Sequence, residues 1–110
     1  MKREIKIILL KEAQQFVDVQ PNKVREKIVR TLNLVKMGMT DVSIFKKLEG
    51  TDIWEFRTEY GSNAYRLLSF WDKKKGAFVV ATHGFLKKTQ KTPRKEIAKA
   101  EAIMVEYYKK

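Results

Sequence analysis

The chain has 110 residues and no cysteine, and its 24 lysines and arginines against 13 acids give a formal net charge of +11. This length suits a single domain over residues 1–110, and the lack of cysteine excludes disulfides and thiolate metal sites, as expected for a cytoplasmic protein. The short apolar runs predict neither a signal peptide nor a membrane span, and the charge favours a polyanionic partner, nucleic acid before an acidic protein or a membrane surface.

The first half of the chain is predicted to form one strand and one or two helices. Residues 2–10 begin with apolar alternation, which predicts a strand, and 11–18 are expected to form a short helix or turn. Apolar residues then recur every three or four positions, which predicts a helix over 21–38 that ends near Gly38. Residues 43–50 are interpreted as an extended segment that leads into the next strand.

The second half is predicted to contain three strands, at 52–60, 63–72 and 76–85, and a last helix. Strands joined by short turns pair antiparallel. The helix is predicted to have Thr92 as its N-cap and Pro93 at its first position. The element order therefore predicts an α+β domain. In it, a small antiparallel sheet of about four strands carries two N-terminal helices and a C-terminal helix, packed on one face.

The hairpin between 52–60 and 63–72 yields a specific register. A two-residue turn of type II′ that begins at Gly61 places Arg57 directly opposite Arg66 on one face of the sheet. Like charges in that position are unfavourable by roughly 0.2–1 kcal/mol, so the pair suggests a shared anion, and a phosphate matches the guanidinium fork. Two alternatives stay open: neighbouring glutamates neutralise the pair locally, or a three-residue loop places the arginines on opposite faces.

A basic segment, HGFLKKTQKTPRKEI at 83–97, follows the last predicted strand. It begins with the only histidine of the chain, His83, which strand parity places on the same face as Val79 and Ala81. Six basic residues and one acid give residues 87–99 a charge of +5. Cations before a helix N-terminus are locally unfavourable, whereas an anion is favoured there. The alternative interpretation is that this segment is a solvated basic loop without a ligand.

Together, these cations suggest a site for a phosphodiester. RNA carries its own nucleophile, the 2′-hydroxyl. Arginines would stabilise the charge of the transition state, and His83, Glu55 or a lysine of lowered pKa would transfer protons. One histidine without cysteine predicts no metal site, and the absence of nucleotide-binding or nucleophile-elbow motifs predicts no cofactor. Nucleic-acid binding without chemistry explains the charge equally well.

The patterns "WEFR", "AYRLL" and "HGFLKKTQKTP" resemble the RelE/ParE superfamily, and more closely the phage-derived, HigB-like toxins of bacterial type II toxin–antitoxin modules. The resemblance spans residues 4–106. It implies a RelE fold and a metal-independent endonuclease that cuts mRNA on the ribosome by 2′-hydroxyl attack. It also implies a cognate antitoxin, often of the helix-turn-helix type, that binds and silences the toxin.

The resemblance also assigns roles to individual residues. The matching arginines would bind phosphate and stabilise the transition state, and the matching lysines would contact RNA or transfer protons. The catalytic candidates are Arg57, Arg66, His83, Lys87 and Lys88. The candidates for RNA binding are Lys91, Arg94 and Lys95. Because the superfamily also contains inhibitors of DNA gyrase, a non-nucleolytic toxin and a basic binding module remain alternatives.

Overall fold

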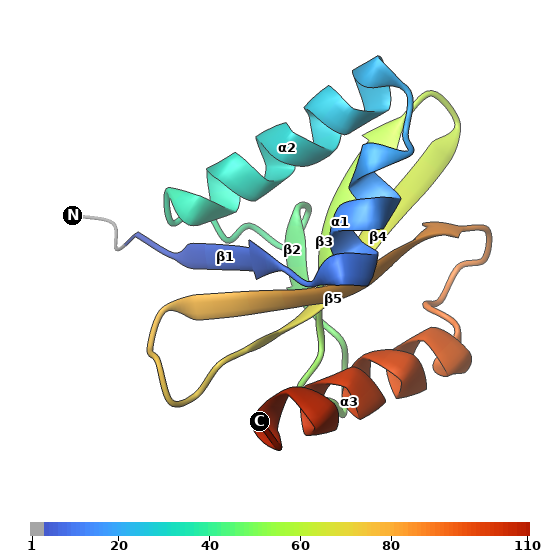
Figure 1. The fold of residues 1–110 in the computed structure, drawn as a ribbon. Helices are drawn as coiled ribbons and strands as arrows, with labels where there is room; N and C mark the ends of the chain where they lie inside the picture. The colour runs from blue at the N-terminus through green and yellow to red at the C-terminus, as the bar shows by residue number, and fades with distance from the viewer. Residues whose placement is uncertain (1–3) are drawn as a thin grey trace.

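The computed structural model describes residues 4–110, which form a five-stranded mixed sheet with helices on both faces (Figure 1). In chain order the elements are β1 (Lys6–Leu9), α1 (Lys11–Asp18), α2 (Asn22–Lys36), β2 (Phe45–Lys47), β3 (Trp54–Tyr60), β4 (Asn63–Trp71), β5 (Phe78–Lys87) and α3 (Arg94–Tyr108). The order of strands across the sheet is β1-β5-β4-β3-β2. No helix of this part of the chain has the length and apolar character needed to cross a membrane.

The prediction of about four antiparallel strands is wrong in two respects. The segment expected only to be extended pairs with β3 as the edge strand β2, and β1 pairs with β5 in the parallel direction. A parallel pair requires a long connection between its strands, which the chain between β1 and β5 supplies. Periodicity along one segment does not reveal which distant strand will lie beside it. The antiparallel pairing of β3, β4 and β5 is confirmed.

The prediction that all helices pack on one face is also wrong. Helices α1 and α2 cover one face, where Phe56, Leu67 and Val79 belong to the larger core. Helix α3 lies on the opposite face, where Ala100 packs against a second core that includes Phe70 (Figure 1). Strand β4 is buried along most of its length because both of its faces are covered.

The predicted register of the β3–β4 hairpin is confirmed. Tyr60 pairs with Asn63 and Arg57 pairs with Arg66. The backbone of Gly61 has a φ of 61°, the positive value that the first central position of a type II′ turn requires. The two arginines therefore share one face of the sheet, the face on which α3 lies.

The helix boundaries agree with the sequence except at the start of α3. The end of α2 at Lys36 is followed by Gly38 with a φ of 92°, as expected for a helix C-terminus. Thr92, however, is not the N-cap of α3, because the capping position is Pro93 and no side chain caps the helix. The Thr92 hydroxyl instead donates a hydrogen bond to Glu55 on β3, at 2.7 Å. An ionised acceptor within reach competes successfully with the helix backbone for this donor.

Candidate nucleic-acid interface

The half of the sheet face that α3 leaves open forms one wall of a groove of about 850 Å³. Strand β2 and the turn after it form a second wall, and the β5–α3 connection with the first turns of α3 forms the third. Four of the predicted site residues line this groove: Arg57, Lys87, Lys91 and Arg94. The four that do not line it are Arg66, His83, Lys88 and Lys95. The structure thus brings together cations from three separate segments.

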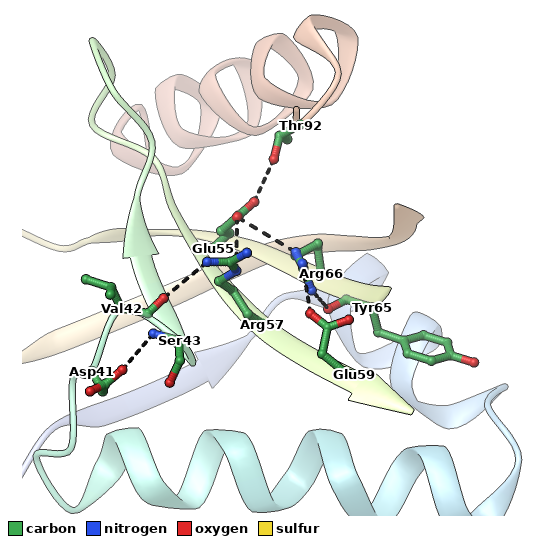
Figure 2. A network of polar contacts seen from close by, with 9 residues as sticks. All are labelled: Asp41, Val42, Ser43, Glu55, Arg57, Glu59, Tyr65, Arg66 and Thr92. Atoms are coloured by element: carbon green, nitrogen blue, oxygen red, sulfur yellow. Dashed lines mark hydrogen bonds and ion pairs between the residues drawn. The ribbon is translucent and has the colours of Figure 1, made fainter. Parts of the chain in front are cut away.

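A buried carboxylate, Glu55, lies between the two predicted phosphate-binding arginines (Figure 2). Its Oε1 atom is 3.6 Å from Nε of Arg57 and 3.8 Å from Nε of Arg66. Its Oε2 atom accepts the hydrogen bond from Thr92. The structure therefore shows the alternative arrangement, in which a neighbouring glutamate neutralises the arginine pair locally. At these distances, however, neither Nε–H group has a hydrogen-bond partner among residues 4–110.

The two arginines differ in accessibility. The side chain of Arg57 is 26% exposed and donates a hydrogen bond to the carbonyl of Val42 at 3.3 Å. Arg66 is only 3% exposed. Its guanidinium donates to the carbonyl of Tyr65 and to the carboxylate of Glu59, both at 3.0 Å. Arg57 is thus available to a ligand in the groove, whereas Arg66 is held behind it by protein groups.

Lys87 lies at the end of β5, where the positive charges gather. Burial lowers the pKa of its ammonium group, and the nearby Arg66, Arg57 and Lys46 lower that pKa further, while the Glu55 carboxylate opposes the shift. A lysine of lowered pKa exchanges protons more readily near neutral pH than an ordinary lysine does. Lys87 is therefore a lysine of lowered pKa that lines the groove.

His83 lies on the opposite face from the one predicted by strand parity. Leu68 pairs with His83 but Ser69 pairs with Ala81, so the residue between them, Thr82, is an extra residue in β5. This β-bulge reverses the alternation and turns His83 towards α3. The imidazole is 2% exposed, and its Nε2 atom lies 3.0 Å from Oε1 of Glu96. The ring is buried behind the groove, away from its surface.

Two lysines that the sequence analysis did not select, Lys46 and Lys47, also line the groove. They lie on β2, where Lys46 pairs with Glu55 across the sheet. Pairing places both residues of a cross-strand pair on the same face, so Lys46 shares the face of the arginines. The alternation of Phe45 with its neighbours could have revealed this edge strand, but a three-residue strand gives too short a pattern to recognise.

The acidic and histidine side chains of residues 4–110 do not assemble as metal ligands. In this part of the chain no group of three or more histidine, cysteine, aspartate or glutamate side chains is placed to hold a metal ion. The buried carboxylate that lines the groove, Glu55, is held by arginines and a hydroxyl group. The groove accordingly offers positive charge, hydrogen-bond donors and one lysine of lowered pKa, beside the carboxylates that also line it.

The fold, an α+β domain with three helices and a five-stranded mixed sheet, is similar to that of chains in two toxin–antitoxin complexes. One similar chain, in the crystal structure of the toxin–antitoxin complex RelBE2 from Mycobacterium tuberculosis, is 16% identical with a TM-score of 0.54. The match covers 77% of this chain and 100% of that one. Another, in the archaeal RelE–RelB complex from Pyrococcus horikoshii, is 17% identical with a TM-score of 0.56 over 82% and 100% of the two chains.

The sequence itself defines the family. Residues 15–105 match the family described as phage-derived protein Gp49-like (DUF891). Because this match spans most of the 110 residues, the chain belongs to the Gp49-like family. No curated protein matches the chain by sequence. The expectation of a RelE fold is confirmed, while the HigB-like subtype stays a prediction.

Proposed function

We propose that this chain is the toxin of a type II toxin–antitoxin module, of the HigB-like kind, and that it cleaves mRNA on the ribosome without a metal ion. The observation that carries the proposal is the groove in which Arg57, Lys87, Lys91 and Arg94 meet. The likeness of the fold to chains from toxin–antitoxin complexes supports the same conclusion. Its target would place the protein in the cytoplasm.

The proposed reaction uses the 2′-hydroxyl of the substrate as the nucleophile. A base removes the 2′ proton, the oxygen attacks the adjacent phosphorus, and the 5′ oxygen leaves with a proton from an acid. The products are a 2′,3′-cyclic phosphate and a 5′-hydroxyl end. Arg57 would stabilise the charge on the non-bridging oxygens, because its partly exposed side chain lines the groove and a guanidinium stays protonated.

The remaining groove residues have distinct proposed roles. Lys87, with its lowered pKa, would carry one of the two proton transfers. Lys91 and Arg94 are exposed on the opposite wall and would bind flanking phosphates. Arg66 would act indirectly, by fixing the Glu55 carboxylate and thereby the position of Arg57. The acidic or amphipathic partner that a toxin of this charge requires would be its cognate antitoxin.

Primer-extension mapping of mRNA after induced expression tests the proposal. Cleavage positions in phase with codons are expected for the wild type. Lys87→Met should abolish the cuts, whereas Lys23→Met, which alters an exposed lysine of α2, should not. Intact transcripts with arrested replication would instead indicate a gyrase inhibitor. Intact transcripts without toxicity would leave only a nucleic-acid-binding module.

A further inference from the structure

The wall of the groove formed by the β5–α3 connection is fastened to the sheet by two side-chain contacts. One is the hydrogen bond from Thr92 to Glu55 at 2.7 Å. The other joins Glu96, in the first turn of α3, to His83 on β5 at 3.0 Å. Between these two contacts lies Arg94, which lines the groove. The contact between His83 and Glu96 has no role in the proposed reaction.

The bulge in β5 makes this second contact possible. With regular alternation, His83 would face α1 and α2, on the side of the sheet to which Ala81 belongs. The extra residue, Thr82, turns the imidazole to the α3 side, where Glu96 meets it. Bulges occur preferentially beside functional sites, where they redirect a side chain. The local irregularity and the contact to α3 therefore belong together.

The hydrogen bonds around His83 hold the ring in both of its protonation states. Glu96 as a carboxylate accepts only, so Nε2 carries a proton. In the neutral ring, Nδ1 accepts a hydrogen bond from the Thr82 hydroxyl at 2.9 Å. In the protonated ring, Nδ1 donates to that hydroxyl, which donates in turn to the carbonyl of Leu68 at 3.2 Å. Neither state requires the ring to leave Glu96.

We propose that His83 is a positioning residue of the groove, which acts through Glu96 to hold the first turn of α3 and thus Arg94 in place. The buried ring does not line the groove, which separates this role from a catalytic one. The expected effect of this positioning on RNA binding rests on the proposed function, whereas its expected effect on the order of α3 does not. Because this turn of α3 is already fixed in the free protein, less conformational entropy is lost when RNA binds.

The charged groups that face His83 come from two helices. Glu96 and Lys99 belong to α3, and Glu12 of α1 pairs with Lys99 at 2.7 Å. Burial lowers the pKa of His83; the hydrogen bond and charge of Glu96 and the charge of Glu12 oppose this shift, whereas Lys99 adds to it. Because the chain has one histidine, its imidazole gives a single NMR titration curve.

The experiment compares Glu96→Ala and Glu96→Gln with Glu106→Ala, an exposed position near the other end of α3. Glu96→Ala should speed amide exchange over residues 94–98 by about tenfold, the effect of losing one hydrogen bond to a charged group. It should also weaken binding of an uncleavable 2′-O-methyl oligoribonucleotide. Glu96→Gln keeps an acceptor for Nε2, so it should restore both properties.

The pH titration tests directly whether the Glu96 carboxylate acts on the His83 ring. In Glu96→Gln the carboxylate that favours the charged ring is gone, so the pKa of His83 should fall below its wild-type value. Glu106→Ala should leave the titration, the exchange rates and the affinity as in the wild type. If Glu96→Ala does not fold, Glu96→Asp, which is one methylene shorter, takes its place with the same expectations.

Three outcomes would overturn the positioning role: unchanged exchange over 94–98 in Glu96→Ala, failure of Glu96→Gln to restore it, or an unaltered pKa of His83 in Glu96→Gln. A wild-type chain that binds no oligoribonucleotide would instead contradict the proposed function. The exchange and titration experiments need no RNA, so they still decide whether His83 holds α3.

Discussion

Replacing Arg66 by alanine should destabilise the fold more than it disturbs the groove surface. The change removes the hydrogen bond to the Tyr65 carbonyl and the contact with Glu59. The Glu59 side chain is exposed, so that contact contributes about 0–1 kcal/mol. The larger effect falls on Glu55, which is 2% exposed and keeps one arginine, Arg57, at 3.6 Å.

Removing one partner of a buried ion pair costs about 3–5 kcal/mol of unfolding free energy. Because Glu55 retains Arg57 and the hydroxyl of Thr92, we expect the low end, about 3 kcal/mol. For a domain of this size that lowers Tm by about 12 °C. Arg57→Ala removes a more accessible partner, 26% exposed, and leaves Glu55 its contacts with Arg66 and Thr92, so it should cost less, about 1 kcal/mol, yet weaken RNA binding strongly.

Urea denaturation followed by circular dichroism measures the difference between the two variants. The double replacement Glu55→Leu with Arg66→Met should recover part of the lost stability, because it removes both fully buried charges and leaves only the more accessible Arg57 without its partner. An Arg66→Ala protein with the wild-type midpoint of unfolding would refute the reasoning. So would an Arg57→Ala protein that loses more stability than Arg66→Ala.

Three further predictions concern other parts of the chain. Tyr107→Phe removes the hydrogen bond from the Tyr107 hydroxyl to Asp72, and this bond lowers the pKa of the Asp72 carboxyl in the folded protein. The stabilisation that the bond provides is present above about pH 4 and is lost at lower pH. In acid unfolding experiments, the stability of the variant should therefore lie closer to that of the wild type at low pH than at neutral pH. Gly84→Ala would place Cβ 2.3 Å from a ring carbon of Phe16 and should cost about 1–3 kcal/mol by thermal unfolding. Lys91→Ala should reduce the salt dependence of RNA binding by about 0.7 in logarithmic slope, measured by fluorescence anisotropy; an unchanged slope would show that Lys91 makes no phosphate contact.

The local features of the fold could be predicted from the sequence because each depends on neighbours along the chain. Apolar alternation located the strands that form most of the sheet, and a stripe of period three to four located α2. Gly61 fixed the hairpin register and hence the pairing of Arg57 with Arg66, because a two-residue turn permits one alignment. The positive charge of the segment before α3 was likewise visible in the composition.

Only the tertiary structure decided which of these cations face a ligand. Burial of Arg66 depends on what covers its face of the sheet, and the groove contribution of Lys46 depends on a pairing with a distant strand. The face of His83 depends on a single extra residue, Thr82, which periodicity does not detect. Alternation specifies two faces for every strand. It is the packing of α3 on one part of one face that separates the buried charges from the accessible ones, because desolvation acts only where another element excludes water.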